Sequence, residues 1–152
     1  MKHYPQAQQV VKGNLNLDEI YYTNSTLFNV GAAVDPIERV KREGLFHPLI
    51  EAGSLTHVWL GESRPSAESL ANFVKKTFRM TQNDQVAFSP ELTTCVTCGK
   101  TSRGLHDLCL YCNSEQVEQI TRITGYFTKV SSWNKGKKGE LRDRFRNLAL
   151  HT

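Results

Sequence analysis

Two pairs of cysteines, each with the spacing CxxC, constrain this chain more than any other feature of its sequence. The pairs read CVTC and CLYC, and their members are Cys95, Cys98, Cys109 and Cys112. Four thiolates with this spacing can surround one tetrahedral zinc ion and complete its coordination shell, which leaves no open position for water or substrate. We therefore predict a four-cysteine zinc ribbon in which the metal is structural and performs no chemistry.

Each cysteine pair can form a tight knuckle in which both sulfurs face the ion. Gly99 and Asn113 directly follow the second cysteine of each pair, where a residue that tolerates a positive φ is needed. The ten residues between Cys98 and Cys109 are enough for a hairpin that brings the knuckles together, and His106 within them is expected to be a loop residue. Iron in the same cage and a redox-active dithiol are the alternatives to zinc, although a thioredoxin-like site needs one CxxC at a helix start.

The overall composition is that of an ordinary globular chain. The 152 residues are 39% hydrophobic and 22% charged, which suits one domain, or one domain with a small appendage. No run of about 18 apolar residues occurs, and the first residues contain no apolar stretch typical of a signal peptide. We expect a cytoplasmic protein, and cytoplasmic thiols stay reduced and free to bind metal.

The positive charge is concentrated between residues 129 and 146. Against Glu140 and Asp143, this segment carries seven cations, which are Lys129, Lys135, Lys137, Lys138, Arg142, Arg144 and Arg146. Such a run is more often a solvated face, or a contact with an acidic partner, than a nucleic-acid site. Only Trp133 and Phe145 interleave with the cations, which are too few aromatic residues for a base-stacking platform. A zinc-ribbon module that binds nucleic acid is nevertheless kept as an alternative.

Capping signals and hydrophobic periodicity predict three helices. Asp35 can cap the first, with Pro36 at its first position and Gly44 at its end. The second follows Pro65, and its apolar face consists of Leu70, Phe73, Val74, Thr77 and Phe78. The third is expected within 140–150, where one face carries Leu141, Phe145 and Leu148. Each of these faces requires a packing partner.

Short β-branched and aromatic stretches predict the strands. They lie within 20–30, 54–62, 86–88 and 120–127. In the second stretch, His57 shares a face with Leu55 and Trp59, so it is interpreted as a hydrogen-bonded core histidine rather than a catalytic one. The last stretch is interrupted by Gly125, which weakens a strand interior.

Several short strings, taken together, resemble the carboxy-terminal end of the anaerobic (class III) ribonucleoside-triphosphate reductases. The string RITGYF runs from Arg122 to Phe127 and precedes VSSWNKGKKGELRDRF, and the earlier strings are YYTNST, GLFHPL, HVWLGE and GLHD. They follow the order of the family from about Tyr21 to Phe145.

The resemblance implies an α+β fold. Its expected parts are the C-terminal portion of a glycyl-radical-enzyme α/β barrel, a zinc ribbon with four cysteine ligands and a glycyl-radical loop. On this basis residues 1–90 are a partial barrel segment of strands and two helices, residues 91–116 are the zinc ribbon, and residues 117–152 are the radical loop with a C-terminal helix.

The same resemblance implies that Gly125 carries a stable glycyl radical. A radical on an α-carbon is delocalised over the flanking amide and carbonyl only when its substituents become coplanar, which a side chain hinders; glycine also allows close backbone approach. In the family, an iron–sulfur activating enzyme of the radical S-adenosylmethionine type removes the hydrogen atom. The glycyl radical then oxidises a cysteine thiol to a thiyl, which attacks the 3′ position of the ribose.

This sequence departs from the family because all its cysteines belong to the two CxxC pairs, so the thiyl-forming cysteine must come from a larger reductase chain. We therefore expect the glycyl-radical subunit or fragment of an anaerobic reductase, an oxidoreductase that is inactive alone. Formate or a thiol-reducing protein would supply electrons. A split-gene subunit, a spare radical module for repair and an inactive truncation are alternatives for its origin.

The resemblance assigns no individual substrate contact. The segment Tyr22, Thr23, Asn24 and Ser25 is expected near the substrate pocket of the barrel, where its polar side chains could bind phosphate. An ordinary turn at Asn24 and Ser25 is an equal alternative. Tyr126 and Trp133 are interpreted as packing residues rather than electron carriers.

Overall fold

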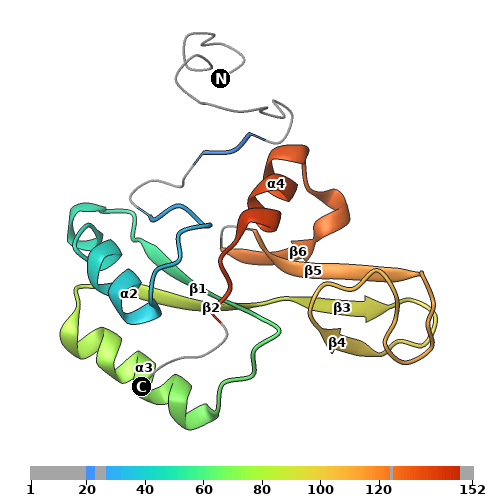
Figure 1. Ribbon diagram of the computed structural model, residues 1–152. Coiled ribbons are helices and arrows are strands. Elements are labelled where there is room, and N and C mark those ends of the chain that lie inside the picture. Colours follow the sequence, from blue (N-terminus) through green and yellow to red (C-terminus); the bar gives the residue numbers. More distant parts are fainter. Residues whose placement is uncertain (1–19, 23–26, 124, 148–152) are drawn as a thin grey trace, which may run out of the picture.

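The computed structural model describes residues 20–22, 27–123 and 125–147 (Figure 1). The helices are α2 (Pro36–Gly44), α3 (Ala67–Met80) and α4 (Lys135–Asp143), with short 3-10 helices at His47–Leu49 and Val130–Ser132. The strands are β1 (Leu55–Gly61), β2 (Gln85–Pro90), β3 (Leu92–Cys95), β4 (Thr101–Arg103), β5 (Val117–Ile123) and β6 (Tyr126–Lys129). They form two sheets, and the fold is mixed α/β.

The first sheet is the parallel pair β1–β2, which α3 connects as a crossover. Helices α2 and α3 lie on the same side of this pair (Figure 1). The hydrophobic core between them contains Val40, Val58, Leu60 and Phe73, all buried. Every residue of β1 after Leu55 is buried, as expected for a parallel strand that is covered on both faces.

The second sheet is antiparallel, with the strand order β4-β3-β5-β6. Strand β5 pairs with both β3 and β6, and Ile123 stands opposite Tyr126 at the end of the β5–β6 hairpin. A second core of Val130, Trp133 and Leu141 packs against Ile123. This core fixes α4 beside the hairpin (Figure 1).

Two of the predicted helices are confirmed. Asp35 caps α2, since its Oδ1 accepts the amide N–H groups of Ile37 and Glu38 at 2.8 and 3.3 Å. Ser66 caps α3, and this cap was not predicted from the sequence. Within the predicted apolar face of α3, Phe73 and Thr77 are buried, but Phe78 is 48% exposed.

The strand predicted within 20–30 is wrong for its described residues. The residues 20–22 have no regular structure, and 27–30 approach a turn in which Asn29 accepts the backbone N–H of Gly31 through Oδ1 and that of Ala32 through its carbonyl. Local bonding of this kind competes with a strand ladder.

The third helix lies earlier in the chain than predicted. Helix α4 begins after Asn134, whose Oδ1 accepts the amide of Lys137, and ends at Asp143. Residues 144–147 have no regular structure, and the amides of Phe145 and Asn147 donate to the carbonyls of Val30 and Trp59. Leu148 lies outside the described residues. The described residues 144–147 contact other segments through their backbone, and hydrophobic periodicity alone cannot distinguish such a segment from a short helix.

The strands predicted at 54–62 and 86–88 are confirmed as β1 and β2, and 120–127 is a hairpin rather than one interrupted strand. Two parallel strands do not constitute a barrel, so the barrel expectation is not established by the described residues. Strands β3 and β5 pair across the expected boundary at residue 116, and the division into three parts stays a prediction. No helix in the described ranges is long and apolar enough to cross a membrane.

Candidate metal centre and glycine hairpin

The two CxxC pairs fold into knuckles with the same hydrogen bonds. In the first, the amide of Cys95 donates to Lys100 and the amide of Gly99 donates back to Cys95, at 2.9 and 3.0 Å. The second repeats the pattern, with Cys109 donating to Ser114 and Asn113 donating to Cys109, both at 2.9 Å. Gly99 has a φ of 70° and Asn113 a φ of 55°. The predicted need for a positive φ at both positions is confirmed.

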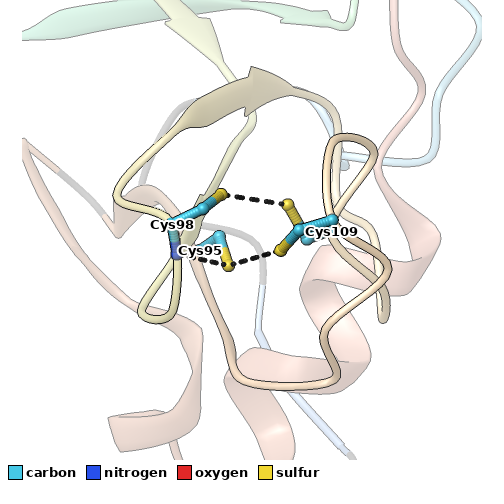
Figure 2. A group of neighbouring side chains, drawn as sticks. Cys95, Cys98 and Cys109 are labelled. Carbon is cyan, nitrogen blue, oxygen red and sulfur yellow. Dashed lines mark hydrogen bonds between the residues drawn. The ribbon is translucent and has the colours of Figure 1, made fainter.

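The structure brings all four predicted ligand residues into one cluster. Their Sγ atoms lie within 4.8 Å of one another. The Sγ atoms of Cys95 and Cys112 are 3.6 Å apart, as are those of Cys98 and Cys109, and Figure 2 shows the side chains from the two knuckles converging. Tetrahedral coordination with Zn–S bonds of about 2.3 Å requires sulfurs about 3.8 Å apart. The cluster therefore fits a metal ion such as zinc.

Backbone amides also point at the sulfurs. The amide N of Cys98 lies 3.4 Å from the Sγ of Cys95, and that of Tyr111 lies 3.4 Å from the Sγ of Cys109. The first contact lowers the pKa of Cys95 to about 6, and the second lowers the pKa of Cys109. At Cys112 the Ser114 amide lowers the pKa, but the Cys109 thiol and desolvation outweigh it and raise the pKa to about 12. Without a cation the cluster retains protons at neutral pH, so a full set of thiolates needs a metal.

His106 is a loop residue, as predicted. Its Nε2 lies 2.7 Å from the carbonyl oxygen of Arg103, and its amide donates to the Thr93 hydroxyl. The expected hairpin between the knuckles is not formed within 99–108: β4 is the one strand there, and it pairs with β3. The first knuckle is therefore itself the turn of a hairpin, and a loop leads to the second.

Gly125 lies in the two-residue connection between β5 and β6. It is exposed, and a Cβ added to it would meet no other heavy atom within 4 Å beyond its chain neighbours. Tyr126 and Phe127, which follow it, are 65% and 41% exposed. The α-carbon of Gly125 is thus open to a reagent or a partner surface.

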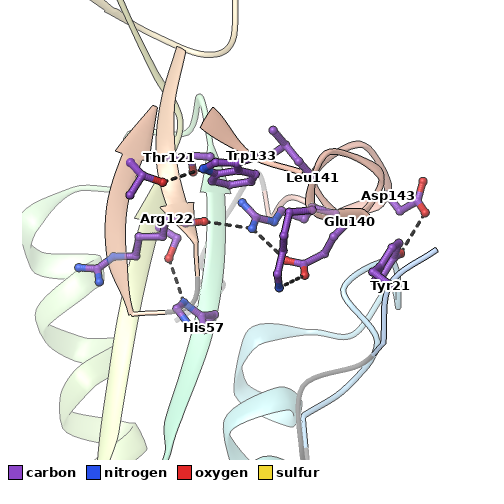
Figure 3. Close-up of polar contacts among 12 residues, drawn as sticks. Tyr21, His57, Thr121, Arg122, Trp133, Glu140, Leu141 and Asp143 are labelled. Atoms are coloured by element: carbon purple, nitrogen blue, oxygen red, sulfur yellow. Dashed lines mark hydrogen bonds and ion pairs between the residues drawn. The ribbon is translucent and has the colours of Figure 1, made fainter. Parts of the chain in front are cut away.

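Behind this hairpin lies a buried cluster of charges and aromatic rings. His57 stacks on Trp59 with a centroid distance of 4.8 Å, and its Nδ1 lies 3.2 Å from the Ser89 hydroxyl. Burial, with the charges of Arg122 and Arg144 adding to it, lowers the pKa of His57 to about 4. Figure 3 shows His57 in front of β1, below the chain that carries Arg122. The interpretation of His57 as a hydrogen-bonded core histidine is confirmed.

The ion pairs of this cluster were not predicted from the sequence. Arg144 donates to Glu140 at 3.0 Å, and both side chains are almost fully buried. A second buried pair on α2 joins Arg39 and Glu43 at 3.1 Å. Both pairs have the i,i+4 spacing of opposite charges on a helix, which is visible in the sequence. The exposed pair Glu38–Arg42 has the same spacing, so spacing alone does not reveal burial.

Ion pairs within the chain occupy most of the cations in the basic segment 129–146. At least five of its seven cations form ion pairs with acids of the described residues, which are Lys129 with Glu118, Lys137 and Arg144 with Glu140, Arg142 with Asp143, and Arg146 with Glu91. Trp133 is buried, whereas Tyr126 is exposed. The packing interpretation therefore holds for Trp133 and is wrong for Tyr126 in this chain.

Of the predicted substrate segment, Tyr22 is 69% exposed, while Thr23, Asn24 and Ser25 lie outside the described residues.

Solved structures share this fold. One, an anaerobic ribonucleotide reductase, is 26% identical with a TM-score of 0.64, and the match covers 80% of this chain and 19% of that one. The anaerobic ribonucleotide reductase from Thermotoga maritima, solved in complex with dATP and CTP, is 23% identical with a TM-score of 0.54, over 76% and 18% of the two chains. No curated protein sequence matches significantly.

The fold and the cysteine cluster thus define a segment of the ribonucleotide reductase class, and the chain spans less than a fifth of the length of the solved reductases. The family model of anaerobic ribonucleoside-triphosphate reductase matches residues 1–146. The chain belongs to this family of oxidoreductases, and the resemblance inferred from its sequence strings is confirmed.

Proposed function

We propose that this chain is the glycyl-radical subunit or fragment of an anaerobic ribonucleoside-triphosphate reductase, with the radical on Gly125 and a structural zinc ion on its four cysteines. The observation that carries the proposal is the position of Gly125. Within a chain matched to the family over residues 1–146, it occupies the exposed tip of a hairpin whose strand β5 also pairs with the ribbon strand β3.

The geometry at Gly125 suits hydrogen-atom removal from its α-carbon. An activating enzyme of the radical S-adenosylmethionine type would take one hydrogen atom, with one electron and S-adenosylmethionine as co-reactants. Nothing outside the adjoining residues approaches within 4 Å of the position that a Cβ would occupy. Since glycine has no side chain, the radical centre can become planar without a steric clash.

A larger chain is the second part of the proposal. All four cysteines of this sequence lie in the metal cluster, so the thiol that becomes a thiyl would come from the partner, together with the nucleotide-binding surfaces. Exposed apolar side chains support such a partner: Leu45, Phe46 and Leu49 are 64%, 44% and 77% exposed and form one short stretch after α2. Patches of this kind mark interaction surfaces when they are contiguous.

The proposal also includes a cytoplasmic location, an electron donor and an origin for the chain. Formate or a thiol-reducing protein would supply electrons. A separate subunit and a spare module for repair both require a functional Gly125, whereas an inactive truncation does not. The test below therefore separates the first two origins from the third.

The test is electron paramagnetic resonance of the full chain, incubated without oxygen with an anaerobic reductase activase, S-adenosylmethionine and a reductant. We expect a doublet that is absent in Gly125→Ala and collapses when glycine is deuterated at the α-carbon. The alanine control is sound because its added methyl group meets open space. No signal with a competent activase, with and without the larger reductase chain, would contradict the proposal.

A further inference from the structure

Arg122 contacts the glycine hairpin in two ways. Its Nη1 donates a hydrogen bond of 2.6 Å to the carbonyl oxygen of Gly125. Its guanidinium carbon lies 4.7 Å from the centroid of the Phe127 ring, which stands directly opposite Arg122 in the β5–β6 register. One side chain therefore contacts the residues on both sides of Tyr126.

The main chain of Arg122 is held by the buried cluster. Its carbonyl oxygen accepts a hydrogen bond of 3.0 Å from Nη2 of Arg144, and Arg144 is itself fixed by Glu140. In Figure 3 the Arg122 side chain extends away from Glu140. The guanidinium therefore extends from a strand residue whose carbonyl is held by Arg144, and its Nη1 donor points at the hairpin tip.

We propose that Arg122 is a positioning residue for the Gly125 radical: it fixes the orientation of the Gly125 carbonyl and withdraws electron density from its oxygen. This inference rests on the proposed function. A glycyl radical is stabilised when its spin spreads onto an electron-accepting carbonyl that is coplanar with the α-carbon. A cationic donor on that oxygen strengthens its acceptor character, because charge-assisted hydrogen bonds are stronger than neutral ones. The stacked Phe127 ring restrains the guanidinium in the required place.

The first arm of the test needs no radical. In a chain labelled with ¹³C at the glycine carbonyls and ¹⁵N in arginine, we compare the wild type with Arg122→Met, Arg122→Lys and Arg42→Met. Arg42 is the matched control, because it is an exposed arginine on α2 that pairs with Glu38. We expect the Gly125 carbonyl resonance to move upfield in Arg122→Met, to move less in Arg122→Lys, and to stay unchanged in Arg42→Met.

The second arm measures the radical itself by electron paramagnetic resonance after activation. Because a hydrogen bond to a charged group at a partly exposed site has a modest net effect, we expect about fivefold less radical, with faster decay, in Arg122→Met. Arg122→Lys, which keeps a cation and a donor, should recover part of the loss. The α-hydrogen splitting should change in Arg122→Met, since it reports spin density that a merely structural defect would not move.

The outcomes separate the two proposals. If the wild type forms no radical, the proposed function fails, and the carbonyl shift alone decides whether Arg122 positions Gly125. If the wild type forms the radical and Arg122→Met matches it in yield, decay and splitting, the positioning role is overturned. Zinc content and amide hydrogen exchange check that each variant is folded. If Arg122→Met is not folded, Arg122→Lys is compared with the wild type instead. An unchanged Gly125 carbonyl shift and an unchanged α-hydrogen splitting in Arg122→Lys would then overturn the inference.

Discussion

The guanidinium carbon of Arg144 lies 3.9 Å from the centroid of the Trp59 ring. The same guanidinium pairs with Glu140 and lies 5.4 Å from the Trp133 centroid. This contact joins the segment after α4 to the parallel strand β1, and it places a buried charge between two aromatic rings.

Breaking this buried pair should be costly. Glu140→Gln leaves the buried Arg144 without its ion-pair partner, and removing one partner of such a pair destabilises a protein by about 3–5 kcal/mol. The free energy of unfolding in urea measures the loss. The matched control is Glu38→Gln, which breaks the exposed i,i+4 pair with Arg42 and should cost about 0.5 kcal/mol or less. Equal losses in the two variants would contradict the structural role of the buried pair.

Zinc should bind once per chain and hold the ribbon together. We expect Cys109→Ser to lose the metal and to lower amide protection in residues 92–123, because thiolate ligands supply the folding energy of such sites. Metal analysis and hydrogen exchange measure both effects. Thr97→Ala is the control, since Thr97 lies within the first CxxC but bonds Ser114 and Gln116 rather than a sulfur. Retention of zinc by Cys109→Ser would exclude the four-thiolate site.

Metal binding should release protons. The pKa of Cys112 is raised to about 12 while that of Cys95 is lowered to about 6, so at neutral pH the metal must displace protons that the cluster retains. We expect zinc affinity to fall as pH falls, and calorimetry in buffers of different ionisation enthalpy should show net proton release. A binding enthalpy independent of the buffer would contradict this.

His57 should make the fold less stable in acid. Its pKa is about 4 in the folded chain and 6.5 when exposed, so below pH 6.5 the unfolded state binds the additional proton. The stabilisation is complete above about pH 6.5 and is lost as pH falls toward 4, which amounts to about 2 kcal/mol between about pH 7.5 and 5. Urea unfolding at both pH values measures it. His57→Gln removes this titration, and an identical pH dependence in the variant would refute the assignment.

Nucleic acid should bind weakly. Since several cations of the segment 129–146 are paired within the chain, few remain to release counterions from phosphates. We expect a Kd weaker than about 10 μM for single-stranded oligonucleotides at 0.15 M salt, by fluorescence anisotropy. Tight binding with a steep salt dependence, lost on neutralising Lys135 and Lys138, would favour the alternative of a nucleic-acid-binding ribbon.

The sequence by itself determined the features that depend on neighbouring residues. The CxxC spacing determined the knuckles, and the residues at Gly99 and Asn113 supplied the positive φ that each knuckle needs. The Asp35–Pro36 signal determined the start of α2. These are local because one or two turns of chain contain every partner involved.

The tertiary structure decided which charges are buried and where the chain leaves its local pattern. The Glu140–Arg144 pair has the same spacing as the exposed Glu38–Arg42 pair, and only packing against Trp59 and Trp133 distinguishes it. Likewise α4 ends at Asp143 because Val30 and Trp59, far away in sequence, accept the amides of the residues that follow. The contact of Arg122 with Gly125 depends on the hairpin register. Non-local partners of this kind have no periodic signature in the sequence, because burial depends on which elements meet in space.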